Sequence, residues 1–281
     1  MDLLIRPFEI PMRHRFRNVD VRSGVLLQGP AGWGEFSPFP EYGTEIAARW
    51  AASAYESATV SRPPPVRDVI PINVTVPAVD AETAHRIVSA SGCSTAKVKV
   101  AEGDDHARVE AVRDALGAEG NIRIDVNAAW DVTTAQRMIM ELDRFDLEYV
   151  EQPVRTLEEM AELRKLVDVP LAADESIRTA EDPLRVAGLE AADIVVIKVQ
   201  PLGGVQNALS VAEAAGLPAV VSSALETSVG ISAGIALAAA LPELPYACGL
   251  GTVSLLERDV SSPSMVPENG GIAVRPVEVD E

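Results

Sequence analysis

Five ionisable residues in the second and third quarters of this sequence recur at nearly constant spacing. Successive members are separated by 26, 26, 23 and 24 residues, in the order Lys99, Asp125, Glu151, Asp174 and Lys198. Carboxylate oxygens that converge on one point are the ligands that a hard divalent cation prefers. The spacing therefore predicts that Asp125, Glu151 and Asp174 bind Mg²⁺, or Mn²⁺ as the alternative, with a lysine on either side.

Lysine is rare in this chain. Of 24 lysine and arginine residues only four are lysines, and the sequence places them at Lys97, Lys99, Lys165 and Lys198. Three of the four lie at the ends of short apolar runs, and Lys97 and Lys99 share one face of their run because side chains alternate along a strand. A lysine can lose its proton when it is desolvated, whereas an arginine cannot. We therefore expect these lysines to take part in proton transfer.

From residue 70 onward, short apolar runs alternate with longer stretches of helical pattern. The runs predicted to be strands are 70–76, 95–100, 122–126, 149–151, 171–173, 194–199, 219–222 and 247–250. Two of the intervening stretches open with a helix-capping pattern, Thr133 with Gln136 and Thr156 with Glu159. Eight strands with seven helices predict a (β/α)7β barrel, which is a TIM barrel without its last helix. In such barrels the chemistry lies at the carboxyl ends of the strands, where the lysines and carboxylates are predicted to lie.

The first part of the chain has a different pattern. Residues 5–11, 19–28 and 32–36 are predicted to be short strands, residues 45–58 a helix, and the proline run 63–65 a domain boundary. Residues 272–279 are expected to form an extended segment that returns to this first part. We therefore predict a barrel domain over 69–254 and a small α+β capping domain over 1–68, joined by about 255–281.

Composition limits the partners. A formal net charge of −18 disfavours nucleic acid and anionic membranes. No apolar run is long enough for a membrane span, and the first residues do not resemble a signal peptide, so we expect a cytoplasmic protein. The two cysteines, Cys93 and Cys248, form no zinc-type cluster. The sequence leaves open whether the protein is a monomer or a small homo-oligomer.

The residues at the strand ends resemble those of the enolase superfamily, in its muconate-lactonising subgroup. The first part of the chain, around Gly32 to Phe39 with Glu41 and Tyr42, is similar to the capping domain of that family. The matching motifs in the barrel are K-x-K at Lys97 and Lys99, D-x-N at Asp125 and Asn127, E-Q-P from Glu151, D-E-S from Asp174, and K-x-x-x-x-G-G from Lys198 to Gly204.

The resemblance implies a Mg²⁺-dependent lyase that removes a proton next to a carboxylate. In this reading the metal ion stabilises the developing negative charge. Lys99 takes the proton and returns one to the departing hydroxyl. Lys198 stabilises the intermediate from the opposite face, and Lys97 holds the substrate carboxylate and keeps the pKa of Lys99 low.

The implied substrate is a small anion, a succinyl-hydroxycyclohexadiene carboxylate, whose loss of water makes the ring aromatic. Ser222, Ser223 and the backbone from Gly249 to Gly251 are expected to hold its succinyl end. Residues 249–252 read Gly-Leu-Gly-Thr and not the D-x-D of dipeptide epimerases, which argues against a dipeptide substrate. Racemisation of N-succinylamino acids and a non-catalytic binding barrel remain as alternatives.

Residues 13–18 are expected to form a loop that closes over the site. Three arginines lie in this segment, Arg13, Arg15 and Arg17. The sequence does not decide between anion binding and simple solvation for these side chains.

Overall fold

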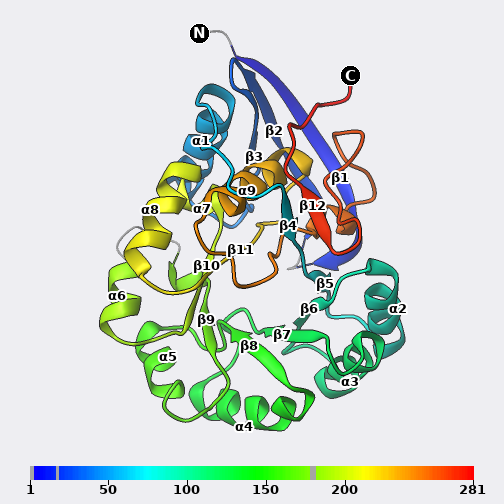
Figure 1. Ribbon diagram of the computed structural model, residues 1–281, viewed down its shortest axis with the longest axis vertical. Coiled ribbons are helices and arrows are strands. Elements are labelled where there is room, and N and C mark those ends of the chain that lie inside the picture. The colour runs from blue at the N-terminus through cyan, green and yellow to red at the C-terminus, as the bar shows by residue number, and fades with distance from the viewer. Residues whose placement is uncertain (1–2, 17–18, 178–181) are drawn as a thin grey trace.

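The computed structural model describes residues 3–16, 19–177 and 182–281. An antiparallel sheet of β1 (Leu4–Phe16), β2 (Val19–Gly29) and β3 (Gly32–Phe36) lies at one end of the molecule, packed against α1 (Thr44–Thr59) (Figure 1). The buried face of α1 follows the spacing of an amphipathic helix, with Trp50, Ser53, Ala54, Ser57 and Ala58. The three strands and the helix predicted for this part of the chain are thus confirmed.

Gly34 allows the capping sheet to approach α1 closely. A Cβ atom at this position would lie 1.9 Å from the carbonyl oxygen of Ala54. No side chain larger than hydrogen fits in that space, so glycine at position 34 sets how closely β3 and α1 can pack.

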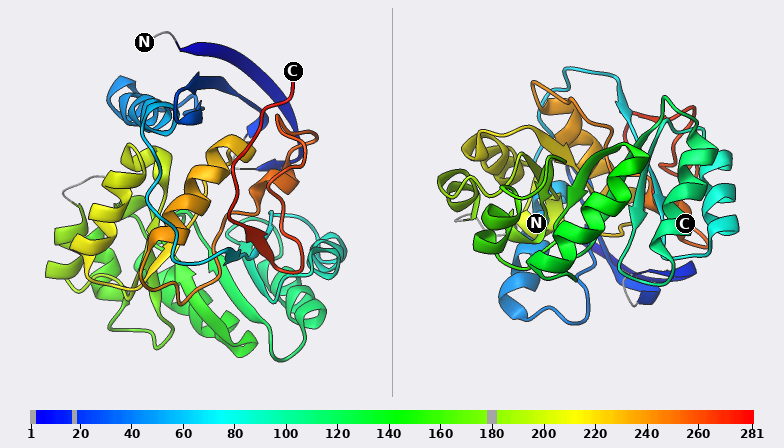
Figure 2. Two further views of the ribbon diagram at one scale, coloured as in Figure 1. Left: turned by 45° about the horizontal axis from the view of Figure 1, so that its top comes forward. Right: turned by 90° about the horizontal axis from the view of Figure 1, so that it is seen from below.

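The barrel consists of parallel strands that are hydrogen-bonded in sequence order, as predicted. Figure 2 shows, in the view from below, the helices arranged around these strands. The seven strands of the ladder are β5 (Val74–Val76), β6 (Thr95–Lys99), β7 (Asn121–Asp125), β8 (Leu147–Glu151), β9 (Leu171–Ala173), β10 (Ile194–Ile197) and β11 (Ala219–Val221). The strands are buried almost throughout, which explains why several of them, such as β9, β10 and β11, are apolar on both faces.

Helices connect successive strands. They are α2 (Ala81–Ser91), α3 (Asp105–Leu116), α4 (Val132–Leu142), α5 (Leu157–Leu163), α6 (Asp182–Gly188), α7 (Val199–Leu202), α8 (Val205–Ala215) and α9 (Ser228–Ala240). The capping box of Thr156 and Glu159 is confirmed. The box predicted for Thr133 and Gln136 is wrong, because the cap of α4 lies two residues earlier, at Asp131, which accepts the capping hydrogen bond from the Thr134 N–H.

The ring closes differently from the sequence prediction. The first predicted strand, 70–76, is divided into β4 (Val69–Pro71) and β5, and β4 pairs with β12 (Gly271–Ala273) of the tail. The predicted eighth strand, 247–250, forms only isolated parallel bridges, from Cys248 to Ile72 and from Gly249 to Ser222. The first predicted strand is interrupted between β4 and β5 because its N–H groups have different partners. The Ile72 N–H donates to the carbonyl of Gly270, whereas the Asn73 N–H donates to the carbonyl of Cys248.

The predicted lid segment is mostly strand. Residues 13–16 lie within β1, so the expectation of a loop is wrong there, while Arg17 and Asn18 fall outside the described residues.

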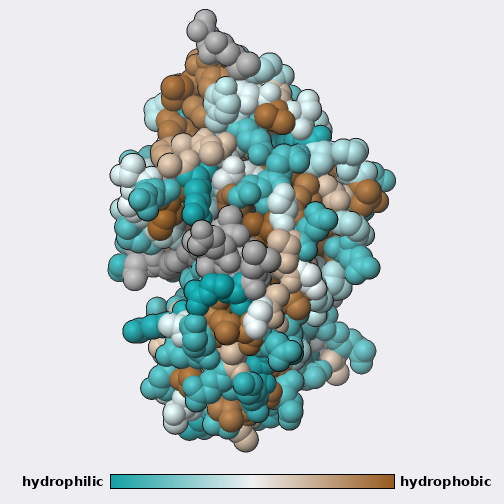
Figure 3. All heavy atoms as spheres, turned by 90° about the vertical axis from the view of Figure 1, so that its left-hand side faces the viewer, coloured by the Kyte–Doolittle hydropathy of each residue, from teal (hydrophilic) through white to brown (hydrophobic). Residues whose placement is uncertain are grey.

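Figure 3 shows one face of the molecule, on which hydrophilic side chains predominate and hydrophobic ones gather near the end that carries the N-terminus. Within the described residues, no helix is both long and apolar enough to cross a membrane.

Candidate active site

Three carboxylates lie at the carboxyl ends of three neighbouring strands. Asp125 ends β7 and is the register partner of Glu151, which ends β8. Asp174 follows directly after β9, the next strand in the sheet. All three side chains are buried, with at most 1% of their surface exposed. The structure therefore brings together the three residues that the spacing singled out.

Three lysines form ion pairs with these carboxylates. The ammonium group of Lys97 lies 2.9 Å from Asp125 Oδ2 and 2.9 Å from Glu151 Oε1, so it bridges β7 and β8. Lys99 donates to Asp125 Oδ2 at 2.6 Å, and Lys198 donates to Asp174 Oδ2 at 2.5 Å. Lys99 on β6 and Lys198 after β10 flank the three strands that carry the acids. The predicted arrangement of central acids between lysines is thus present.

Burial and charge shift the pKa values of these groups in different directions. Burial lowers the pKa of Lys99, and the nearby charge of Lys97 lowers it further, although Asp125 opposes both. Burial also acts to lower the pKa of Lys97, but Asp125 and Glu151 outweigh it and hold this pKa well above its usual value. Burial, together with the charge of Asp125, raises the pKa of Glu151 to about 7. The site therefore concentrates negative charge that needs positive partners.

The donor set suits a hard divalent cation. Three buried carboxylates converge at adjacent strand ends, and oxygen ligands of this kind are the ones that Mg²⁺ and Mn²⁺ prefer. As described, however, the side chains do not surround a common point: no group of three Asp, Glu, His or Cys in the described part of the chain has metal-site geometry. The lysine ammonium groups hold the carboxylates instead. Metal binding by Asp125, Glu151 and Asp174 therefore stays a prediction.

Two amides position the strand ends, and the sequence reasoning assigned neither a role. Gln152 is fully buried, and its Oε1 accepts hydrogen bonds from the backbone N–H groups of Asp174 and Ser176. Asn127 accepts a hydrogen bond from Lys99. Both residues have positive φ, 38° and 49°, a strained conformation that is common at functional sites. Gln152 belongs to the E-Q-P motif and Asn127 to the D-x-N motif, and these motifs were the sequence signal that could have indicated a positioning role for both residues.

The residues expected to hold the succinyl end differ in their positions. Ser222, Ser223 and Gly249 line the cavity at the strand ends, whereas Gly251 is not among its lining residues. The Gly249 N–H donates to the carbonyl of Val221, so it is already used within the barrel and is not a free donor for a substrate. Thr252, which was not predicted, lines the cavity and exchanges a hydrogen bond of 2.8 Å with Ser223.

The cavity at the strand ends is small, about 30 Å³, which is room for roughly one water molecule. Phe16 and Phe39 of the capping domain and Leu225 of the loop after β11 are among the residues that line it. A larger cavity of about 430 Å³ adjoins it and shares Phe16, Lys99 and Asn127 with it. Thr75 lines the smaller cavity, and its hydroxyl group is buried without a hydrogen-bond partner among the described residues.

A buried polar network holds the capping domain against this site. Arg22 is 2% exposed, and its guanidinium donates to the carbonyl of Leu225 at 2.9 Å and to Ser37 Oγ at 3.0 Å. Leu225 lines the cavity and has a φ of 67°, which is unusual for a residue other than glycine. Arg22 thus fixes a strained residue of the loop that carries Ser222 and Ser223.

Two carboxylates complete the network. Glu35 accepts hydrogen bonds from the Thr227 hydroxyl at 2.6 Å and from the Gly230 N–H at 3.0 Å. Glu226 accepts one from the Ala224 N–H at 2.6 Å. Burial raises the pKa of both groups, and for Glu226 the charge of Glu35 adds to this effect and brings the pKa to about 7. No sequence pattern predicted this network, apart from the resemblance of residues 32–39 to a capping domain.

Comparison with known proteins supports the fold and the motifs together. A family model described as enolase C-terminal domain-like matches residues 79–277, and one described as enolase N-terminal domain-like matches residues 8–58. A protein of Thermobifida fusca named o-succinylbenzoate synthase is 64% identical over 281 residues, covering 98% of this chain and 89% of that protein. An o-succinylbenzoate synthase of Mycolicibacterium smegmatis is 52% identical, covering 96% and 85%.

Solved structures share the same architecture. The L-Ala-D/L-Glu epimerase of Bacillus subtilis superposes with a TM-score of 0.86 at 22% identity, covering 99% of this chain and 97% of its own. A dipeptide epimerase of Enterococcus faecalis, complexed with Mg and a dipeptide, superposes with a TM-score of 0.82 at 21% identity, covering 98% and 97%. At these identities the likeness shows the fold alone.

Proposed function

The chain belongs to the enolase superfamily and, within it, to the family of the o-succinylbenzoate synthases, and from this we propose that it converts 2-succinyl-6-hydroxy-2,4-cyclohexadiene-1-carboxylate to 2-succinylbenzoate by loss of water. This reaction serves menaquinone biosynthesis. The observation that carries the proposal is the order of the strands: Lys99 and Lys198 flank three strands that end in buried carboxylates.

The carboxylates would hold a divalent cation, with Mg²⁺ as the candidate. Asp125, Glu151 and Asp174 supply oxygen donors from adjacent strands. When bound, the cation would act as a Lewis acid that lowers the energy of negative charge on the substrate carboxylate. The backbone N–H of Asn127, which donates to Asp125 Oδ1, and the Gln152 side chain, which accepts from the backbone N–H of Asp174, would keep the ligands in place.

Lys99 would act as the base. Burial lowers its pKa, which favours the neutral amine that can accept the proton next to the substrate carboxylate. The same ammonium group would then return a proton to the departing hydroxyl, so that elimination takes place on one face of the ring. The Asn127 side chain, which accepts a hydrogen bond from Lys99, would orient the amine.

Lys97 and Lys198 would serve as fixed positive charges. Lys97 keeps its proton, since its pKa is held well above the usual value by the two acids that it bridges. It would therefore bind the substrate carboxylate electrostatically. Lys198 lies at the other side of the row of carboxylates and would stabilise the charged intermediate from the face opposite Lys99.

The direct test is an assay with the purified protein. The cyclohexadiene carboxylate should disappear, with 2-succinylbenzoate formed in equal amount, only when Mg²⁺ or Mn²⁺ is present. Turnover by metal-stripped protein at the full rate would contradict the assignment of the carboxylates. Failure of the substrate to react under any condition would contradict the proposed reaction.

Racemisation of N-succinylamino acids needs the same lysines and is the alternative reaction. In D₂O, only racemisation puts deuterium at the α-carbon of recovered substrate of inverted configuration. We expect kcat/KM for the dehydration to exceed that for racemisation by a wide margin. Comparable values for the two reactions would reverse this assignment.

A further inference from the structure

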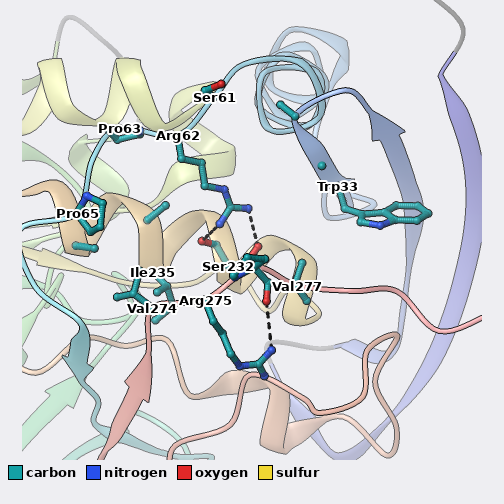
Figure 4. A pocket seen from close by; sticks show the side chains of 15 residues that line it. Trp33, Ser61, Arg62, Pro63, Pro65, Ser232, Ile235, Val274, Arg275 and Val277 are labelled. Carbon is teal, nitrogen blue, oxygen red and sulfur yellow. Dashed lines mark hydrogen bonds between the residues drawn. The ribbon is translucent and has the colours of Figure 1, made fainter.

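A second cavity lies between the capping domain and the barrel, away from the strand ends. Its volume is about 380 Å³, within the range of ligand sites. Four segments form it: β3, the linker after α1, α9 and the C-terminal tail. It shares no lining residue with the two cavities at the active site. Figure 4 shows Arg62 extending from the linker toward Ser232 of α9, with Trp33 on the other side.

The lining of this cavity is positively charged. It includes Arg62 and Arg275 but no aspartate or glutamate. This composition is unusual for a chain in which 42 of 281 residues are acidic. Within the described residues, neither arginine has a carboxylate within ion-pair distance, whereas many other arginines of the chain do. The cavity therefore carries two positive charges without a counter-ion.

Arg62 has donor capacity beyond its contacts in the protein. Its guanidinium donates to the carbonyl of Ser232 at 2.5 Å and to the Ser232 hydroxyl at 2.7 Å. A guanidinium has five N–H groups, so these two bonds leave several donors unused. Burial lowers the pKa of Arg62, and no neighbouring acid compensates. An anion in the cavity would supply the missing partner.

Arg275 is anchored so that it stays beside the cavity. It donates to the carbonyls of Pro263 at 2.7 Å and of Ser264 at 3.2 Å, on the segment that precedes the tail. These acceptors are uncharged, so the positive charge of Arg275 is not neutralised. The two arginines come from segments far apart in sequence, and the fold brings them to one cavity.

Most of the remaining wall is apolar. Its hydrophobic residues include Trp33, Ile235 and Val277, which are each largely buried, and the prolines of the linker. An inorganic anion would leave these surfaces without a partner. A ligand with a carboxylate at one end and an apolar body at the other would match both parts of the cavity.

We propose that this cavity is a binding site for a small carboxylate with an apolar body, distinct from the active site. The carboxylate accepts hydrogen bonds from Arg62, Arg275 adds a second positive charge to the cavity wall, and the apolar body packs against Trp33, Ile235 and Val277. The proposal does not depend on the reaction proposed above, because it concerns other residues and is tested by binding.

The position of the cavity gives binding a structural consequence. Trp33 precedes Glu35 by two residues on β3, and Ser232 follows Gly230 by two residues on α9. Glu35 and Gly230 are hydrogen-bonded to each other across the boundary between the capping domain and the barrel. A ligand that contacts Trp33 and Ser232 therefore joins the same two elements a second time, and it should raise the melting temperature.

The test is calorimetric titration of the purified full chain with benzoate as the probe. We expect saturable binding of one equivalent. Two control ligands separate the parts of the site: benzamide, which has the same shape without the charge, and inorganic phosphate, which has charge without an apolar body. Both should bind at least about ten-fold more weakly. Phosphate that binds as tightly as benzoate would contradict the apolar half of the site.

Substitutions in the second cavity and in the active site show which of the two binds benzoate. Arg62→Gln and Arg275→Gln should each weaken benzoate binding at least about ten-fold, and Ala236→Leu, which fills the cavity, should abolish it. Lys198→Met at the active site should leave it unchanged. Circular dichroism checks that each variant is folded, and Arg275→Gln tests the site on its own if Arg62→Gln is not. Absence of saturable binding, or binding that is lost in Lys198→Met but kept in Arg275→Gln, would overturn the proposal.

Discussion

Lys99 and Asp125 are register partners on neighbouring parallel strands, and the ammonium group of Lys99 donates a hydrogen bond of 2.6 Å to Asp125 Oδ2. The proposed base and a proposed metal ligand are therefore fixed relative to each other by the sheet itself. A change in either side chain leaves the backbone geometry of the other intact. For this reason, substitutions at the two positions can be interpreted as chemical changes.

Lys99→Arg should remove the base while it retains the charge. Arginine does not lose its proton near neutral pH, and general base catalysis contributes about 10²–10⁴-fold, so we expect kcat to fall by at least that factor. Lys165→Arg is the matched control, because Lys165 is exposed in the turn that follows α5. Steady-state kinetics of the two variants decide the point. If Lys99→Arg stays within a few-fold of Lys165→Arg, then Lys99 is not the base.

Removal of a carboxylate should weaken cation binding directly. Asp125→Asn, Glu151→Gln and Asp174→Asn each replace a charged oxygen donor by an amide, and we expect Mg²⁺ affinity to fall at least about ten-fold with nearly complete loss of turnover. Chelation of the metal should abolish the activity of the unmodified protein. Glu158→Gln is the control, since Glu158 pairs with Arg185 on the surface. Calorimetric titration with Mg²⁺ measures the effect, and unchanged affinity in all three variants would exclude these residues as ligands.

Arg22→Lys should affect the active site without contact with the substrate. A lysine keeps the charge but cannot span Leu225 and Ser37, so a buried carbonyl loses its donor, at a cost of about 1–3 kcal/mol of unfolding free energy. Because Leu225 lines the cavity, we also expect a higher KM. Arg137→Lys, which keeps an exposed pair with Glu141, should change neither quantity measurably. Urea unfolding and kinetics test both effects, and a normal KM in Arg22→Lys would show that the contact is structural only.

Glu226 should make stability depend on pH. Burial raises its pKa from an ordinary value of 4.5 to about 7, so the folded protein binds more protons than the unfolded chain between these values. The contribution of Glu226 to stability is fully present below pH 4.5 and is lost as the pH rises through 7, up to about 3 kcal/mol.

Glu226→Gln keeps the shape and removes the titration. We expect the free energy of unfolding of this variant to vary less between pH 5.5 and 8 than that of the unmodified protein, as measured with urea. Glu243→Gln, at an exposed position, should show the unmodified pH dependence. The same curve for Glu226→Gln and the unmodified protein would mean that Glu226 does not titrate in this range.

The sequence predicted the barrel because its strands are buried on both sides. Runs such as 194–197 are apolar throughout, and their regular spacing is itself the signal of a βα repeat. The site followed from the same repeat, since one βα unit separates Asp125 from Glu151. Lysine usage then identified Lys99 and Lys198. The apolar runs, the βα spacing and the lysine usage are each visible in a short segment or in a regular repeat. A single sequence is therefore enough to predict the barrel and the candidate site residues.

What the sequence could not show depends on contacts between distant segments. The division of the first barrel strand at Asn73 results from hydrogen bonds to Cys248 and Gly270, which no pattern near Asn73 reveals. Arg22 looks like a surface residue of a strand, yet it is buried against a loop about 200 positions later. The N–H of Gly249 was expected to be a free donor, and only the fold shows that Val221 accepts it.

The closure of the ring by single bridges at Cys248 and Gly249 also determines the order in which this chain can fold during synthesis. Until those residues leave the ribosome, β5 and β11 are open edges of an otherwise paired sheet. At typical rates of elongation, Ile72, which precedes β5, waits on the order of ten seconds or more for its bridge to Cys248. An exposed strand edge is a template for pairing with other chains. A nascent chain that stalls before residue 247 is therefore the form of this protein most exposed to aggregation, and the last 35 residues protect the barrel as well as complete it.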